Sequence, residues 1–148
     1  MLIPPIKCQG IKTKIVPEII KNVSWDRSGK WIEPFLGSGV VLFNIAPERA
    51  VVSDTNRHII SFYKKIQQRQ ITGELVRNYL LETGNKLSSI GDSFFYLMRE
   101  RFNKTGDSLD FLFLNRSCFN GVMRFNSKGE FNVPFCHKLN RFRQSYIT

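Results

Sequence analysis

The stretch WIEPFLGSGVVLFNIAPERAVVSD, residues 31–54, contains the pattern that decides the fold class. Its apolar start, residues 31–35, predicts a short strand that the glycine turn at residues 37–39 ends. Residues 40–46 then favour a helix, and residues 50–53 predict a second strand. A strand, a glycine turn, a helix and a strand in this order open a βαβ unit, so we expect a parallel sheet and an α/β fold.

The turn and the acid after the second strand form a candidate nucleoside site. Gly37 and Gly39 leave room for a ligand against the backbone, and the next helix offers free N–H groups at its N-terminus. Asp54 is placed to accept hydrogen bonds from two ribose hydroxyls, as acids at this point of nucleotide-binding sheets do. The alternative is a tight turn and a helix-capping aspartate. The strand, the turn and the acid together favour the nucleoside site.

Two other nucleotide motifs are absent from this stretch. A dinucleotide fingerprint requires a third glycine three residues after the second, where this chain has Leu42. A Walker-type phosphate loop requires Gly-Lys-Ser/Thr after the turn, and none follows. The sequence therefore disfavours a dehydrogenase and a P-loop enzyme.

The remainder of the chain is predicted to be mainly helical. Residues 1–11 contain two prolines and are expected to be extended. Pro17 suits a first helical turn, and Asn56 suits a helix N-cap. Helices are expected over residues 13–23, 56–68, 73–87 and 93–103. No further alternation of strands and helices follows, which indicates a helical insertion or second lobe from about residue 70 onward.

A second informative segment is NRSCFNGVMRFNSKGEFNVPFC, residues 115–136. It interleaves asparagine, phenylalanine and basic side chains, whereas a segment that only packs would hide its polar groups or alternate them with apolar ones. Amides and guanidinium groups read base edges, and aromatic rings stack on or between bases. The segment therefore indicates a nucleic-acid partner.

The distribution of charge supports the same partner. The formal net charge is +10 and the sequence pI is 9.9, a balance that favours a polyanion. Residues 115–148 carry six Lys/Arg and one acid, and residues 1–24 carry four and one. The basic excess thus lies at the two ends of the sequence.

The cysteines and the hydropathy narrow the cellular setting. Cys8, Cys118 and Cys136 are an odd count without metal-type spacing, so we expect reduced thiols in an intracellular protein and no metal site. No signal-peptide pattern begins the sequence, and no apolar stretch approaches 18 residues. We expect a soluble, cytoplasmic protein without a membrane partner.

Three segments together resemble the DNA adenine-N6 methyltransferases of the Dam type, the D12 class. Residues 7–12, KCQGIK, are similar to the family's Lys-x-x-Gly-x-Lys element. Residues 33–39 with Asp54 are similar to its S-adenosylmethionine pocket. Residues 115–136 are similar to its DNA-reading segment. Their sequence, with that of the N-terminal element, is most similar to restriction-associated methylases that protect GATATC.

The resemblance implies an α/β fold with a partial Rossmann-like methyltransferase sheet and a helical DNA target-recognition lobe. Residues 1–70 would form the N-terminal part of the cofactor-binding domain, and residues 71–148 the mainly helical recognition region. The implied cofactor is S-adenosyl-L-methionine, and the implied partner is double-stranded DNA with a GAT-containing site. The enzyme would act in restriction-modification or Dam-like methylation in a bacterium or phage, in association with the nucleoid.

The resemblance also assigns the cofactor-binding residues. Lys12 would contact the cofactor, Asp54 its ribose, and the glycines its methionine portion. Position 8 is usually aromatic in Dam itself, so with Cys8 a ring contact is lost or supplied elsewhere. The full set is Cys8, Lys12, Phe35, Gly37, Gly39 and Asp54.

A second set would contact DNA. Phe119 would act as a wedge in the base stack with support from Asn120, and Arg124 would read a guanine in the major groove, a contact worth roughly 1–3 kcal/mol of discrimination. The alternatives are a core role for Phe119 and a surface salt bridge for Arg124. The full set is Lys7, Arg116, Phe119, Asn120, Arg124 and Asn132.

The family's catalytic element is an Asp-Pro-Pro-Tyr type tetrapeptide that accepts hydrogen bonds from the amino group of a flipped adenine. No such tetrapeptide occurs in the 148 residues, so no catalytic residue is assigned. We expect a fragment without the C-terminal catalytic part, inactive alone, with exposed sheet edges that favour self-association or docking of the missing portion. The other hypotheses are a non-catalytic DNA-binding protein that uses the same lobe and an RNA-binding module.

Overall fold

A computed structural model describes residues 1–142, so residues 143–148 of the predicted DNA-reading region lie outside the described residues. The order of elements is η1 (Thr13–Ile15), α1 (Val16–Asn22), β1 (Trp31–Glu33), α2 (Val40–Ile45), β2 (Ala50–Val52), α3 (Arg57–Gln67), α4 (Gly73–Ile90), α5 (Asp92–Thr105), α6 (Ser108–Ser117) and η2 (Phe119–Gly121). The chain is thus a mixed α/β structure, mostly helical, with one small sheet in the described part.

The sheet has two parallel strands, as the order of strand, turn, helix and strand predicts. Trp31 pairs with Ala50 and Glu33 with Val52, and α2 forms the crossover between the strands. Strand β1 ends two residues earlier than predicted because Pro34 has no N–H for a ladder hydrogen bond. The parallel pairing brings the glycine turn and Asp54 to the same edge of the sheet.

The predicted helices are confirmed with small shifts at their ends. Pro17 lies in the first turn of α1, and the side chain of Asn56 accepts a hydrogen bond from the His58 N–H at the start of α3. Helices α4 and α5 extend two to three residues beyond the predicted C-terminal ends. The apolar stretch that follows them is a further helix, α6, capped by Asp107. Within residues 1–142, no helix combines the length and apolar character that a bilayer crossing requires.

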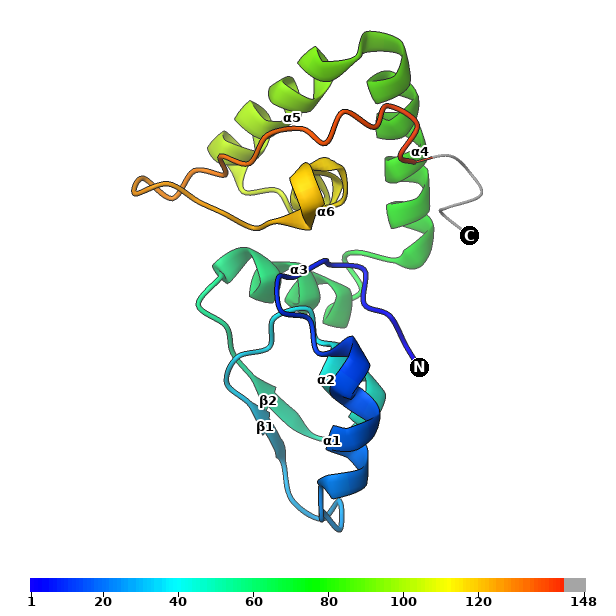
Figure 1. Ribbon diagram of the computed structural model, residues 1–148, viewed down its shortest axis with the longest axis vertical. Helices are drawn as coiled ribbons and strands as arrows, with labels where there is room; N and C mark the ends of the chain where they lie inside the picture. The colour runs from blue at the N-terminus through cyan, green and yellow to red at the C-terminus, as the bar shows by residue number, and fades with distance from the viewer. Residues whose placement is uncertain (143–148) are drawn as a thin grey trace.

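Figure 1 shows α4, α5 and α6 packed together in one part of the molecule and β1, β2, α1 and α2 in the other, with α3 between them. The main buried cluster extends from Phe62 of α3 through all three helices to Phe142. Asp110 of α6 is 1% exposed and accepts hydrogen bonds from Tyr79 of α4 and Arg101 of α5. One carboxylate therefore ties the three helices together.

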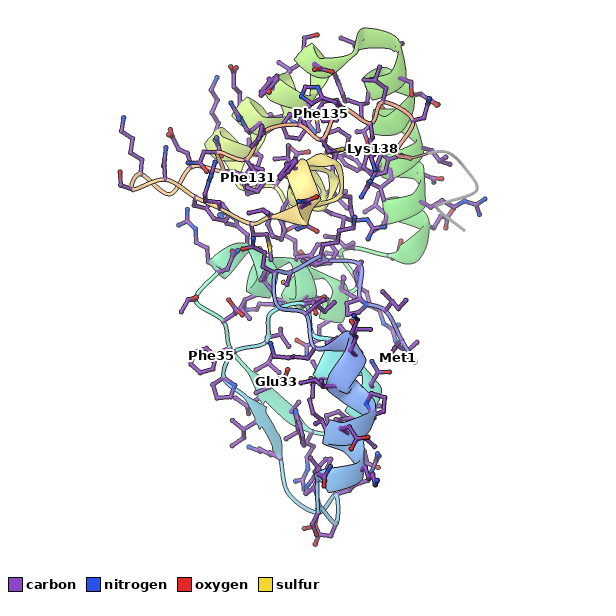
Figure 2. All side chains as sticks on the ribbon, viewed as in Figure 1. Met1, Glu33, Phe35, Phe131, Phe135 and Lys138 are labelled. Carbon is purple, nitrogen blue, oxygen red and sulfur yellow. The ribbon has the colours of Figure 1, made fainter. Side chains whose placement is uncertain are left out.

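The phenylalanines of residues 115–136 have two different environments. Phe131 and Phe135 are 1% exposed and point into the helical part, as Figure 2 shows. Phe125 is half-buried, whereas Phe119 is 55% exposed. The expectation that the rings of this segment stack on bases is therefore wrong for Phe131 and Phe135, because the segment also supplies part of the core.

Candidate cofactor pocket and DNA interface

Asp54 lies over the glycine turn, and a backbone N–H group holds each of its carboxylate oxygens. Its Oδ2 accepts a hydrogen bond from the Gly37 N–H at 2.8 Å, and its Oδ1 accepts one from the Asn56 N–H at 2.8 Å. The helix N-cap is Asn56, so Asp54 is not itself the cap of α3. Each oxygen keeps a lone pair for a further donor, such as a hydroxyl group.

The two glycines of the turn differ in what surrounds them. Both have positive φ angles, 54° at Gly37 and 78° at Gly39, which favour glycine. A Cβ at Gly37 would meet nothing within 4 Å, so the backbone there is open to a ligand. A Cβ at Gly39 would lie 2.7 Å from the Phe43 ring, which makes Gly39 a packing position at the start of α2.

Cys8 and Tyr63 lie beside the same turn. Burial and the neighbouring Asp54 charge raise the pKa of Cys8 to about 11, so its thiol is protonated at neutral pH. The Tyr63 hydroxyl donates to the Ser38 carbonyl at 2.5 Å, and burial with the nearby Cys8 raises the pKa of Tyr63. The N-terminal segment, the turn and α3 therefore meet around Asp54.

Lys12 and Phe35 are directed elsewhere. Lys12 is exposed, and its Nζ donates to the Gly10 carbonyl at 2.5 Å within its own loop. Phe35 is 81% exposed and projects from the lower part of the molecule in Figure 2. Their cofactor contacts stay predictions.

Asn115 joins the N-terminal segment to the predicted DNA-reading segment, residues 115–136. Its amide is 0% exposed, accepts from the Lys7 N–H at 2.8 Å and donates to the Lys7 carbonyl at 2.9 Å. The same amide donates to the Gly121 carbonyl at 3.3 Å. A Cβ at Gly121 would lie 2.7 Å from the Lys7 side chain, so only glycine allows this close approach. Two motifs that are far apart in sequence are thus in direct contact.

Phe119 and Asn120 begin the short exposed turn η2 within residues 115–136. The Phe119 N–H donates to the Pro134 carbonyl at 2.9 Å, while its ring is 55% exposed. Asn120 has a φ of 52°, a left-handed conformation that asparagine tolerates better than most residues. The exposed ring does not fit the alternative of a core role.

Arg124 is exposed and contacts Asn132. Its Nε donates to Asn132 Oδ1 at 2.8 Å, and its Nη2 donates to the Asn132 carbonyl at 3.3 Å. Among the described residues Arg124 takes part in no ion pair, so the salt-bridge alternative finds no partner there.

Three basic side chains gather where the N-terminal segment meets α6. Burial first, then Arg141 and Arg116, lower the pKa of Lys7. Burial and Arg141 likewise lower the pKa of Arg116, and Arg141 Nε donates to the Arg116 carbonyl at 2.9 Å. None of the three forms an ion pair within residues 1–142. Such unpaired, mutually repelling cations favour an anionic ligand.

A model of the D12 class N6 adenine-specific DNA methyltransferases matches residues 9–147. The chain belongs to this family. It is 34% identical over 158 residues to the type II methyltransferase M.MjaIII of Methanocaldococcus jannaschii, with 89% of the chain and 51% of that relative covered. It is 34% identical over 146 residues to the DNA adenine methylase of Serratia marcescens, with 96% of the chain and 50% of that relative covered. It is 36% identical over 122 residues to the DNA adenine methylase of Escherichia coli K12, with 78% of the chain and 40% of that relative covered. The chain thus spans about half the length of these relatives.

The family motifs explain which site residues the sequence indicates and which it misses. Asp54 and Arg124 belong to motifs with recognisable spacing. Tyr63 and Asn115 do not appear among the predicted site residues, because their contacts join distant segments. Asn115 opens the predicted DNA-reading motif, but the residues next to it in the sequence give no sign that its amide is buried against Lys7.

Proposed function

We propose that the chain supplies the cofactor-binding and DNA-reading parts of a site-specific DNA adenine-N6 methyltransferase that uses S-adenosylmethionine. The observation that carries the proposal is the Asn115 amide, which holds Lys7 of the N-terminal segment and Gly121 of the DNA-reading loop at once. Cys8, next in the chain, lies near Asp54. The methyl donor and the DNA reader would therefore lie side by side.

The residues around the turn fit the cofactor. S-adenosylmethionine supplies a methyl group on a sulfonium centre. Asp54 has free lone pairs for the two ribose hydroxyls and is held by Gly37 and Asn56. Gly37 leaves space against its backbone, and the neutral Cys8 thiol adds no second negative charge beside Asp54. Lys12 is proposed to reach the methionine carboxylate.

The proposed DNA contacts are of three chemical kinds: insertion of a ring into the base stack, hydrogen bonding to a base edge, and binding of phosphates. Phe119, supported by Asn120, is proposed to insert into the base stack while the target adenine is flipped out. Arg124 is proposed to read the guanine of a GAT-containing site. Lys7 and Arg116 are proposed to bind phosphates, since both lie in a basic cluster that forms no ion pair within the described residues.

Cofactor binding tests the pocket. Calorimetry with S-adenosylmethionine should give measurable affinity for the chain, and Asp54→Ala should weaken it by about tenfold or more, because hydrogen bonds to a charged acceptor contribute roughly 1.5–3 kcal/mol each. Asp26→Ala is the matched control, since Asp26 also accepts from a backbone N–H two residues later. Equal affinity in wild type and Asp54→Ala would contradict the pocket.

The 148 residues contain no Asp-Pro-Pro-Tyr type tetrapeptide. We propose that the chain alone transfers no methyl group, because the acceptors that orient the adenine amino group are absent from it. A labelled-methyl assay on duplex DNA that detects turnover by the purified chain would disprove this. The same absence favours a second candidate, a non-catalytic DNA-binding protein. In that case duplex binding would persist without affinity for S-adenosylmethionine.

A further inference from the structure

Arg124 and Asn132 are linked by three hydrogen bonds at the base of a hairpin, residues 124–132, in which Phe125 and Phe131 form an antiparallel bridge. Besides the two bonds from the guanidinium, the Asn132 N–H donates to the Arg124 carbonyl at 3.2 Å. The Asn132 side-chain oxygen and its carbonyl oxygen therefore both face Arg124. Only the side-chain NH₂ group of Asn132 is left for another acceptor.

The remaining donors of Arg124 have a defined direction. A guanidinium group carries five N–H donors, one on Nε and two on each terminal nitrogen. The Nε donor and one Nη2 donor bond Asn132, so within residues 1–142 the edge formed by Nη1 and the second Nη2 donor has no hydrogen-bond partner. Two parallel donors on one edge match the O6 and N7 acceptors of guanine.

The backbone next to Asn132 is itself held by α5. The Asn103 side chain accepts from the Phe131 N–H at 2.8 Å and donates to the Phe131 carbonyl at 3.2 Å, as a paired strand would do. One turn earlier on α5, Arg99 donates to the Val133 carbonyl at 3.4 Å. The backbone on either side of Asn132, at Phe131 and at Val133, is thus held by side chains of the same helix.

We propose that Asn132 is a positioning residue, which acts on DNA through Arg124 by leaving only the Nη1/Nη2 edge of that guanidinium free for guanine. Asn103 supports this geometry by holding the Phe131 peptide. The inference deepens the proposed function and rests on it. It assigns Asn132 to base discrimination, whereas a direct phosphate contact would contribute to affinity without regard to sequence.

A double-mutant cycle with duplexes containing GAT or AAT tests the proposal. Wild type should prefer GAT by about 5- to 150-fold, the range that one bidentate base contact supplies. Asn132→Ala should reduce this preference to within about threefold and leave the salt dependence of binding unchanged. In an Arg124→Ala background Asn132→Ala should have no further effect, because coupled residues are not additive. Asn140→Ala, at an exposed asparagine, is the control.

A measurement without DNA keeps the proposal testable if specificity is weak. The Arg124 Nε–H resonance should exchange slowly with water in wild type and rapidly in Asn132→Ala and Asn103→Ala, with the thermal unfolding midpoint checked for each. Additive effects in the cycle, or an equal loss of affinity for the GAT and AAT duplexes with the preference intact, would overturn the inference and assign a phosphate contact. If wild type itself shows no preference for GAT while its Arg124 Nε–H is protected, the proposed function fails and the Asn132–Arg124 geometry stands.

Discussion

The buried amide of Asn115 is the side chain on which contact between the two motifs depends. Asn115→Ala would leave the Lys7 N–H and carbonyl without their partners, and each unsatisfied buried group costs about 1–3 kcal/mol. We expect the free energy of unfolding to fall by about 2–4 kcal/mol, measured by urea denaturation. Asn85→Ala, at an exposed position of α4, should change it by less than about 0.5 kcal/mol. A loss below about 1 kcal/mol for Asn115→Ala would contradict this role.

Arg141 lies beside Lys7 and Arg116 although no motif includes it. If the cluster binds a DNA phosphate, Arg141→Gln should weaken binding equally for all duplex sequences and reduce the slope of log affinity against log salt by about one. Fluorescence anisotropy at several salt concentrations measures both quantities. Arg77→Gln, an exposed arginine of α4, should leave the slope unchanged. An Arg141 effect confined to one sequence would indicate a base contact instead.

Individual site residues could be predicted only where a motif fixes their type and spacing. Asp54 follows a strand, and Arg124 lies in a recognisable run, so the sequence proposes both as site residues. Asn103 and Asn115 satisfy backbone groups of segments distant in sequence, and no local pattern reports such bonds. Arg141 joins Lys7 only through folding.

Helix α3 connects the sheet to the hairpin of residues 124–132 through His58. The His58 ring stacks on Phe125 at 5.3 Å between centroids and lies 4.8 Å from Phe102. Burial, followed by the charge of Arg57, lowers the pKa of His58 below its ordinary value of 6.5. The folded protein therefore binds fewer protons at His58 than the unfolded chain does when the pH is near or below 6.5.

Stability should accordingly decrease as the pH falls from about 7 through 6.5, because protonation then favours the unfolded chain. One such group contributes a slope of up to about 1.4 kcal/mol per pH unit. His58→Phe keeps an aromatic ring and should remove this component of the slope in denaturation series between pH 7.5 and 5.5. His137→Gln is the matched control at the other of the two histidines. Identical slopes in wild type and His58→Phe would show that His58 does not titrate in this way.

Helices were easier to predict than the segments that pack on them. Pro17 and Asn56 mark helix starts by local chemistry, so α1 and α3 begin close to the predicted residues. The aromatic run after α6 could not be divided in the same way. Whether Phe131 is buried or exposed depends on α5, which presents Asn103 to its backbone.

The folded chain brings its two basic ends together. Lys7, from the first basic segment, lies beside Arg116 and Arg141 of the last one. The charge pattern predicted a polyanionic partner, but the common site of the two ends follows only from the contact between the N-terminal segment and α6. The main buried cluster also crosses the predicted boundary at residues 70/71, so that division into two parts stays a prediction.

An apolar groove of about 820 Å³ lies along β2, α3 and the N-terminal residues. Val51 is 52% exposed, Ile66 37% and Ile3 76%, although all three are large apolar side chains that line the groove. In the described part of the chain the sheet has two strands, so there β2 also has an unpaired edge next to the groove. An unpaired edge beside exposed apolar surface favours association with another chain.

We therefore expect the isolated chain to self-associate through this face, with the apparent mass rising with concentration in sedimentation velocity experiments. Val51→Lys places a charge on the edge strand and should shift the equilibrium toward the monomer by about tenfold or more, since it removes apolar contact and desolvates a charge on pairing. Leu97→Lys, at a 60% exposed leucine of α5 in the other part of the molecule, should leave the mass distribution as in wild type. A wild-type chain that stays monomeric at all concentrations would exclude the interface. Equal effects of both lysine variants would instead show that association follows general surface hydrophobicity and not the groove beside β2.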